Sequence, residues 1–311
     1  MSDLTQWTYK RLHSITSATT LTDYQVKIRV YRTEGTSTGD TVYLGSKCLA
    51  DYGDIRFVAS DATTELSYWM ETNAGTYADF WVKVPSIVSD SSIYIYYGNF
   101  SATTTSNGDD TFEFFDDFST NTIGVNWIEN YSYTGAGAYM SAHTIENSGY
   151  HAYQPSASDK GAGLIKSTAL TNQTVCHITL SYTTRGGRSP PWTYFNLGYD
   201  NSIITYGYWG GTQLYNPNSP NDTLDLVWTD GRTSSNIKFY RGGSLVYTGS
   251  AAFASNKKPS FLVRTAGSET INLYYKSFYA TKYSATEPTH VSWSEEQKVT
   301  SYPLRITITP T

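Results

Sequence analysis

Hydrophobic and polar residues alternate through most apolar segments of this chain, which is the period-2 pattern of β-strands with one buried face. In residues 24–31 the even positions are Tyr, Val, Ile and Val, and Gln, Lys and Arg stand between them. Regularly spaced segments of the same kind follow, and they predict the short strands of a sandwich or barrel. These further strands are expected at residues 54–58, 66–70, 79–84 and 92–97.

The alternation continues after residue 110 with longer connections, and it predicts a second set of strands. Gly242 and Gly243 separate two alternating runs, which favours a tight hairpin because glycine adopts positive φ without steric cost. No capped helical run of useful length occurs, so the fold class is predicted to be all-β. The expected strands are 112–118, 175–184, 193–199, 203–208, 223–229, 236–240, 245–249, 260–264, 271–279 and 304–309.

The two sets of strands meet at residues 110–118, an aromatic and acidic segment with the sequence Asp-Thr-Phe-Glu-Phe-Phe-Asp-Asp-Phe. A chain of 311 residues is long enough for two domains with a core each. We therefore predict two β-sandwich domains, the first at 1–105 and the second at 106–290, followed by a C-terminal β extension at 291–311.

Charge and hydropathy restrict the partners that the chain can have. The net charge is −5, and the dipeptide Lys257-Lys258 is too short to form a basic face, so nucleic-acid binding is not expected. No apolar run approaches the roughly 20 residues of a membrane-spanning helix, so membrane insertion is not expected. The first residues lack the charged and apolar regions of a signal peptide. We expect an extracellular or virion-surface location, and the missing signal peptide favours the virion.

Ordered pieces of the first domain carry a family resemblance: Trp7, Arg11, Tyr24-Gln-Val, and the segments 48–57, 60–61, 66–71, 80–85 and 93–99. Over about residues 5–118 the chain resembles the family catalogued as domain of unknown function 2341. The resemblance implies a β-sandwich module of large bacterial and archaeal surface proteins. No active site is known for that family, so no catalytic residue is carried over.

The second domain is similar in pattern to another fold. The matching features are Phe115-Asp-Asp-Phe-Ser, Trp127, the hairpins near Gly231 and Gly242, and the segment 271–275. They resemble the concanavalin A-like lectin/glucanase fold in its laminin-G-like variety. That resemblance implies a jelly roll of two curved sheets over about residues 112–285, which is often used to recognise carbohydrate or protein. The fold by itself does not fix the function.

Glucan hydrolases of that fold place their catalytic carboxylates on a single strand, and two carboxylates on one face need i, i+2 or i, i+4 spacing. The comparable clusters here are Glu113 with Asp116-Asp117, and Asp222 with Asp225. We interpret Asp116 and Asp117 as acceptors for backbone amides where the strand enters the sandwich. No catalytic residue is therefore predicted, and the protein is not expected to be an enzyme. The five histidines show neither nucleophile nor metal spacing.

No cofactor is expected apart from Ca²⁺, which takes six to eight oxygen ligands. Asp116, Asp117 and Asp200 are weak candidates for such a site, and no complete calcium-binding loop motif is present. The two cysteines, Cys48 and Cys176, fall in different predicted domains. We expect both to be buried free thiols rather than a disulfide.

Aromatic loops of the second domain are the predicted ligand site, because a glycan site combines exposed Trp or Tyr rings with polar side chains. The segments 185–192 and 206–216 are rich in glycine, proline and aromatic residues, which is typical of exposed turns. The candidate glycan-binding residues are Arg185, Trp192, Tyr208, Trp209, Tyr215 and Asn216.

These observations favour a non-catalytic surface recognition protein that is carbohydrate-binding or adhesive, with a glycan or a cell-surface protein as its partner. One alternative is a structural or receptor-binding component of a virion tail or fibre, or of an extracellular assembly, which would self-associate. A divergent glycoside hydrolase is the other alternative, and the missing carboxylate motif disfavours it.

Overall fold

The computed structural model describes residues 2–129, 138–155, 160–168, 170, 174–186, 192–196, 203–206, 221–228, 237–241, 244–249, 258, 260–265 and 270–299. The chain divides into two compact units, which we call unit 1 (Met1–Thr111 with Ser284–Thr311) and unit 2 (Phe112–Tyr283). These boundaries lie close to the predicted ones, except that the C-terminal segment belongs to unit 1.

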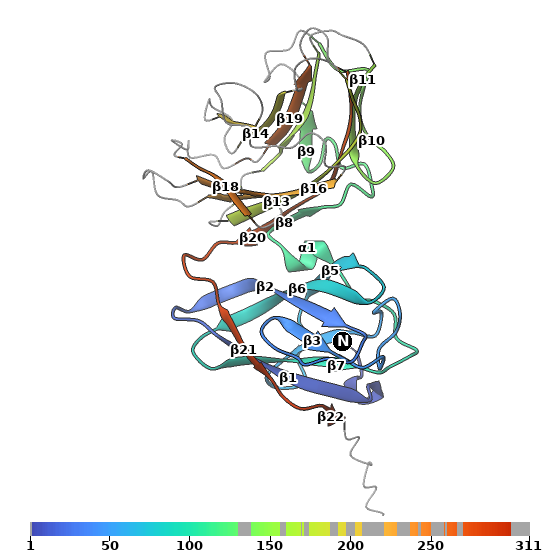
Figure 1. Cartoon of the computed structure of the whole chain (residues 1–311), viewed down its shortest axis with the longest axis vertical. Helices are drawn as coiled ribbons and strands as arrows, with labels where there is room; N and C mark the ends of the chain where they lie inside the picture. Colours follow the sequence, from blue (N-terminus) through green and yellow to red (C-terminus); the bar gives the residue numbers. More distant parts are fainter. Residues whose placement is uncertain are drawn as a thin grey trace, which may run out of the picture. The chain divides into compact units, whose positions relative to one another are not determined.

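Unit 1 consists of short strands from the sequence before and after unit 2 (Figure 1). It also contains a 3-10 helix η1 (Leu4–Gln6) and a one-turn helix α1 (Gly108–Thr111). Its strands are β1 (Tyr9–Thr16), β2 (Leu21–Tyr31), β3 (Thr41–Tyr43), β4 (Arg56–Ala59), β5 (Tyr68–Asn73), β6 (Tyr77–Ile87), β7 (Ser91–Tyr97), β21 (Thr289–Trp293) and β22 (Gln297–Lys298). One sheet has the order β21-β1-β7-β4, with β22 also paired to β1, and the other has the order β3-β2-β6-β5. The β2–β3 pair is parallel and the other pairs are antiparallel.

The core of unit 1 lies between these two sheets. Alternate residues of β2, such as Ile28 and Val30, are fully buried, while Arg29 between them is not. Phe57 of one sheet and Phe80 of the other meet edge to face, with ring centroids 5.5 Å apart. Burial of each such ring stabilises the fold by about 1.5–3 kcal/mol. The predicted β-sandwich is therefore confirmed for unit 1.

The segment after unit 2 completes the first sheet of unit 1. β21 pairs antiparallel with β1, with His13 opposite Trp293, and β22 pairs with the start of β1, with Tyr9 opposite Lys298. The C-terminal β extension predicted at 291–311 thus starts at residue 289 and is an edge of this sheet. The strand predicted at 304–309 lies outside the described residues.

Unit 2 is also built of strands that form two sheets (Figure 1). Its strands are β8 (Phe114–Asp116), β9 (Trp127–Glu129), β10 (Ala142–Ile145), β11 (Tyr150–Gln154), β12 (Lys160–Lys166), β13 (Thr174–Gly186), β14 (Trp192–Asn196), β15 (Ile203–Tyr206), β16 (Asn221–Trp228), β17 (Ile237–Arg241), β18 (Ser244–Gly249), β19 (Ser260–Thr265) and β20 (Thr270–Lys282). In the described residues one sheet has the order β10-β11-β20-β13-β16-β17-β18, with β8 paired to β20, and the other has the order β15-β14-β19-β12-β9.

An aromatic cluster fills the space between the sheets of unit 2. Trp127 is fully buried, and its ring lies 5.0 Å from that of Phe261 and 5.4 Å from that of Phe278. The two-sheet sandwich predicted for this part is confirmed, as is the antiparallel β17–β18 hairpin. Cys48 and Cys176 are both buried, and neither forms a disulfide.

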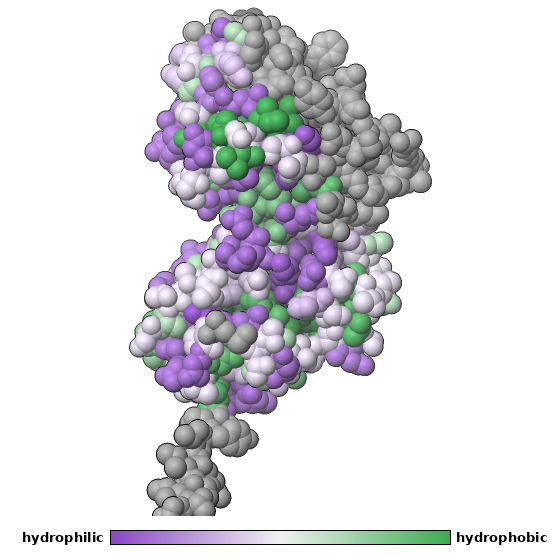
Figure 2. Space-filling view, turned by 180° about the vertical axis from the view of Figure 1, so that it is seen from behind, coloured by the Kyte–Doolittle hydropathy of each residue, from purple (hydrophilic) through white to green (hydrophobic). Residues whose placement is uncertain are grey.

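On the face that Figure 2 shows, the described surface is mostly hydrophilic or neutral, with small hydrophobic areas. Among the described residues no helix is long and apolar enough to cross a bilayer. Isolated exposed apolar side chains are ordinary on a protein surface and do not mark a site. In the described part the exposed large ones are Val88, Phe100, Val125, Ile128, Leu245 and Val291.

Candidate functional site

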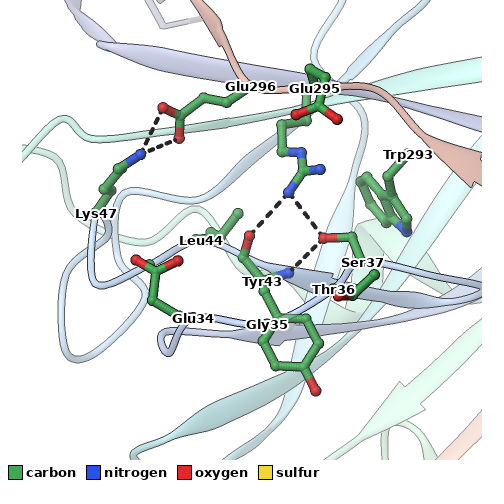
Figure 3. A pocket seen from close by; sticks show the side chains of 12 residues that line it. Glu34, Gly35, Thr36, Ser37, Tyr43, Leu44, Lys47, Trp293, Glu295 and Glu296 are labelled. Atoms are coloured by element: carbon green, nitrogen blue, oxygen red, sulfur yellow. Dashed lines mark hydrogen bonds and ion pairs between the residues drawn. The ribbon is translucent and has the colours of Figure 1, made fainter.

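A polar pocket of about 380 Å³ lies in unit 1, which falls in the usual size range for small-ligand sites. We call it the Arg11 pocket. It is formed by β1, by the connection between β2 and β3 with the residues that follow β3, and by the C-terminal segment after β21 (Figure 3). The lining residues are Arg11, Glu34, Gly35, Thr36, Ser37, Tyr43, Leu44, Gly45, Lys47, Trp293, Glu295 and Glu296.

Arg11 ties together the three segments that form the pocket. Its Nε donates to the carbonyl of Ser294 at 2.8 Å, and its Nη1 donates to Ser37 Oγ at 2.9 Å and to the carbonyl of Tyr43 at 3.1 Å. Nη2 makes no hydrogen bond within the described part of the chain. The guanidinium is therefore held in place, and one of its nitrogens is left as a donor for a ligand.

The wall opposite the C-terminal segment is held by Ser37 and two glycines. Ser37 Oγ also accepts a hydrogen bond from the Tyr43 amide at 3.0 Å. A Cβ on Gly35 would overlap the Tyr43 ring, and a Cβ on Gly45 would overlap the carboxylate of Glu34. Gly45 also has φ of +59°, a conformation that favours glycine. The two glycines therefore let the backbone of this wall lie close to the side chains of Tyr43 and Glu34.

An ion pair closes one end of the pocket. Lys47 Nζ lies 2.7 and 2.8 Å from the two carboxylate oxygens of Glu296 (Figure 3). The Glu296 carboxylate also accepts a hydrogen bond from the Tyr97 hydroxyl at 2.8 Å. The hydrogen bond to Glu296 raises the pKa of Lys47. Burial alone would raise the pKa of Glu296, but the hydrogen bonds from Lys47 and Tyr97 outweigh it and the pKa is lowered. Glu296 therefore stays ionised and cannot serve as a general acid near neutral pH.

Trp293 provides an aromatic wall. Its indole stacks on the buried ring of His13, with centroids 3.9 Å apart, and its Nε1 donates to the carbonyl of Gly39 at 3.1 Å. One face of the indole is thus covered by His13, while the half-exposed ring also lines the pocket. The flat apolar face of a tryptophan suits the C–H face of a sugar ring.

Two carboxylates of the pocket are uncommitted. The side chains of Glu34 and Glu295 are exposed, and within the described residues neither makes a hydrogen bond or an ion pair. Together with Arg11 Nη2 they supply both acceptors and donors. A hydroxyl group can use both kinds, because it donates one hydrogen bond and accepts others.

Asp116 and Asp117, which are weak calcium candidates, accept hydrogen bonds from the protein itself. Asp116 is 5% exposed, and its Oδ1 accepts the Phe118 amide at 2.8 Å. Its Oδ2 accepts from Thr122 Oγ1 at 2.6 Å and from Trp127 Nε1 at 2.7 Å. Asp117 accepts the Ser119 amide at 2.9 Å. The interpretation of both residues as amide acceptors is confirmed.

The remaining calcium and carboxylate candidates do not add a described site. Asp200 lies outside the described residues, and so do the side chains of Asp222 and Asp225 on β16. In the described part no three His, Cys, Asp or Glu side chains gather in a metal-binding arrangement.

The structure does not test the glycan-binding residues predicted in the second domain, so they stay a prediction. Arg185 and Trp192 lie in β13 and β14, where their backbones pair with Ile271 and Arg264, and their side chains are outside the described part. Tyr208, Trp209, Tyr215 and Asn216 also lie outside the described residues.

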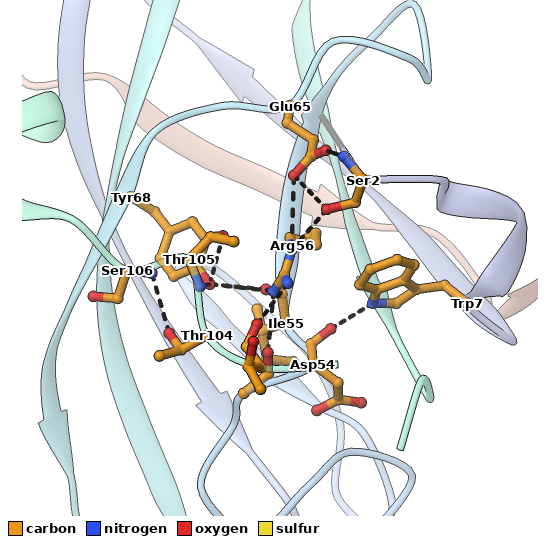
Figure 4. Close-up of polar contacts among 12 residues, drawn as sticks. Ser2, Trp7, Asp54, Ile55, Arg56, Glu65, Tyr68, Thr104, Thr105 and Ser106 are labelled. Carbon is orange, nitrogen blue, oxygen red and sulfur yellow. Dashed lines mark hydrogen bonds and ion pairs between the residues drawn. The ribbon is translucent and has the colours of Figure 1, made fainter. Parts of the chain in front are cut away.

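The most specific motif of the first domain, at residues 48–57, builds a buried polar cluster rather than a site (Figure 4). Arg56 is 3% exposed and donates to the carbonyls of Gly53, Ile55 and Thr103 at 2.7–3.1 Å. Asp54 is fully buried and accepts the amides of Leu49 at 2.8 Å and Gly98 at 2.7 Å. Burial raises the pKa of Asp54. The motif therefore connects three loops of unit 1.

Comparison with known proteins agrees with a module of this kind. A family model described as a domain of unknown function (DUF2341) matches residues 51–130, which include Asp54 and Arg56. This match confirms the resemblance predicted for the first domain. No curated protein matches the chain.

Solved structures with a similar arrangement share 10–12% sequence identity with the chain. One belongs to work on endo-acting O-glycanases of the human gut microbiota that initiate mucin breakdown. Its TM-score is 0.38, and the match covers 56% of this chain and 100% of that chain. The laminarinase catalytic domain of Thermotoga maritima has a TM-score of 0.36, with 55% and 97% covered. SCLam, a family GH16 endo-beta-1,3(4)-glucanase, has a TM-score of 0.37, with 54% and 89% covered.

The sequence did not predict the Arg11 pocket, and the structure shows why. Its residues come from positions 11, 34–47 and 293–296, which are brought together by the pairing of β1 with β21. Arg11 carried a signal only as part of the family resemblance. The loop 34–40 read as an ordinary polar connection.

Proposed function

We propose that this protein recognises carbohydrate without catalysing a reaction, and that the Arg11 pocket is its binding site. The observation that carries the proposal is that the Trp293 indole, an uncommitted guanidinium nitrogen and two unpaired carboxylates line a single pocket. A sugar presents an apolar C–H face with a rim of hydroxyl groups, and each of these features has a counterpart in the pocket.

The states of Glu296 and Asp116 support binding rather than hydrolysis. A glycosidase needs one carboxylic acid that is protonated and a second, ionised carboxylate at a defined separation. Glu296 is ion-paired with Lys47, which lowers its effectiveness as an acid, and Asp116 has both oxygens occupied by protein donors. The adhesive and virion-surface roles predicted from the sequence are compatible with such a binding protein and stay predictions.

A glycan array followed by titration of the best-binding oligosaccharide tests the proposal. Glu34→Ala and Glu295→Ala remove exposed, unpaired carboxylates, so they should leave thermal stability unchanged and weaken binding by about tenfold each. Asp90→Ala is the matched control, because Asp90 is exposed in unit 1 and does not line the pocket.

Four outcomes would contradict the proposal. Absence of binding to any glycan would reject carbohydrate recognition. Wild-type affinity in both pocket variants would place the site elsewhere, and loss of binding in Trp192→Ala or Trp209→Ala instead would place it in the predicted loops of unit 2. Release of reducing sugar from the bound oligosaccharide would show an enzyme.

A further inference from the structure

The charged groups of the Arg11 pocket also restrict the class of sugar that it can take. The pocket contains two cations, Arg11 and Lys47, and three anions, Glu34, Glu295 and Glu296, so its formal charge is 2 − 3 = −1. Only one of these two cations is available to a ligand, because the charge of Lys47 is neutralised by both carboxylate oxygens of Glu296. Only Arg11 remains to attract an anion.

The hydrogen bonds of Arg11 to the protein prevent its guanidinium from binding an acidic group in the bidentate mode. A carboxylate or sulfate is bound most strongly by two parallel N–H groups on one edge of a guanidinium. One such edge includes Nε, which donates to the Ser294 carbonyl, and the other includes Nη1, which donates to Ser37 Oγ and the Tyr43 carbonyl. Each edge therefore has one nitrogen already committed to the protein, and Nη2 remains as a single donor.

The uncommitted carboxylates act against an acidic ligand. Glu34 and Glu295 line the same pocket and make no ion pair within the described part of the chain, although the charge of Lys47 interacts with Glu34. A ligand carboxylate would be placed beside two like charges, which raises its free energy of binding.

A neutral hydroxyl-rich ring avoids this penalty. Its hydroxyls can donate to Glu34 and Glu295 and accept from Arg11 Nη2, and its C–H face can lie on Trp293. We infer that the Arg11 pocket selects neutral sugar residues and excludes sugars that carry a carboxylate or a sulfate. This inference rests on the proposed carbohydrate recognition and narrows it to one chemical class.

The test compares matched oligosaccharides that differ only in charge. N-acetyllactosamine is compared with its sialylated and sulfated forms, and the neutral glycan that binds best on an array is compared with its carboxylated or sulfated forms. Titration calorimetry at low ionic strength measures each affinity. The neutral member of the best-binding pair should bind at least about tenfold more tightly than its charged counterparts, because a misplaced charge in the pocket costs binding energy.

The double variant Glu34→Gln/Glu295→Gln identifies the cause of the selection. It removes both charges and keeps amide oxygens as acceptors, so the ratio between neutral and acidic affinities should fall several-fold even if neutral binding weakens. Asp90→Asn is the charge-matched control and should leave the ratio unchanged. An acidic sugar that binds wild type as tightly as its neutral counterpart overturns this inference while leaving carbohydrate recognition intact. Failure of every sugar to bind rejects the proposed function itself.

Discussion

His13 Nε2 lies 2.7 Å from His290 Nδ1, so two imidazoles join β1 directly to β21. His13 is fully buried, and its Nδ1 lies 3.0 Å from the carbonyl oxygen of Ser292. A carbonyl only accepts, so Nδ1 of His13 carries its proton and Nε2 is the acceptor. His290 Nδ1 must then donate. Both rings satisfy this arrangement when they are neutral, and a proton on His13 Nε2 would break it.

Acid should therefore loosen the pairing of β1 with β21. Burial lowers the pKa of His13 to about 3, assisted by repulsion from His290, and burial also lowers the pKa of His290 against the opposing effect of Asp40. Because the unfolded chain takes up these protons near pH 6.5 and the folded chain does not, stability falls as pH decreases below that value. We expect Tm to drop by about 3–5 °C between about pH 7 and pH 5.5, where carboxylates stay ionised.

The control for this pH dependence is His290→Asn, which removes one titrating ring and keeps an amide that can donate to His13. Differential scanning fluorimetry should show a smaller change of Tm with pH in the variant. Equal slopes in variant and wild type would mean that other groups cause the effect.

Arg56→Met should destabilise unit 1 strongly. The substitution removes the donor to the carbonyls of Gly53 and Thr103 and one of the two donors to the Ile55 carbonyl, the other being the Tyr68 hydroxyl. It also removes the contact of the guanidinium with the Trp7 ring at 5.1 Å. Loss of a buried, charged hydrogen-bonding group costs about 3 kcal/mol or more. Urea denaturation measures this change. Arg56→Lys should recover little, since an ammonium cannot span the same acceptors, whereas Lys298→Met on the exposed strand β22 should be nearly neutral.

Asp116→Asn should lower the stability of unit 2 by about 1–3 kcal/mol, because an amide replaces the carboxylate that accepts from Phe118, Thr122 and Trp127. Thermal unfolding checks the size of the loss.

Excess CaCl₂ should not raise the Tm of wild type. No β-glucan hydrolysis is expected from either protein, and reducing-sugar release by wild type that disappears in Asp117→Asn would show a catalytic role.

Gly35→Ala should be more damaging than its backbone geometry alone implies. The added methyl would overlap the Tyr43 ring, which stacks on Tyr31 with centroids 4.7 Å apart. Overpacking of this kind costs about 1–3 kcal/mol, and the displaced Tyr43 carbonyl would also weaken the hold on Arg11. Gly75→Ala is the informative comparison, since its φ is +79° but open space surrounds it. Chemical denaturation measures the stability of both variants. A Gly35→Ala variant that is no less stable than wild type would contradict this packing argument.

Trp192→Ala and Trp209→Ala test the aromatic loops predicted in unit 2. If these loops bind a glycan, each truncation should weaken binding by about 2 kcal/mol at unchanged Tm, since exposed tryptophans offer the largest apolar contact face. A fall in Tm without an effect on binding would instead identify packing residues.

The sequence pattern predicted most strands because one face of each is apolar. β2 and β6 are examples, with buried residues such as Val26 and Val82 at alternate positions. β1 was missed because its most deeply buried positions are His13 and Ile15, and a buried histidine does not register as apolar. β12 was missed because Gly161 and Gly163 interrupt the alternation although they lie in a buried strand.

The pocket was beyond sequence reasoning for a different reason. Its free donor exists only because two other nitrogens of Arg11 are held by the Ser294 carbonyl and by the loop around Ser37. Local patterns do not contain hydrogen bonds between residues so far apart in the chain. The polar cluster of Asp54 and Arg56 was easier to detect, since its members are nearly adjacent and form part of a family motif.

The return of β21 and β22 to β1 sets the order in which the protein can be completed during synthesis. The ribosome finishes β1 to β7 first, yet the outer edge of β1 stays without its partners until residues 289–298 have emerged. An unpaired strand edge readily joins strands of other chains. All of unit 2 is made during that interval, so a slow or stalled synthesis of unit 2 would extend the period in which nascent chains can aggregate through β1.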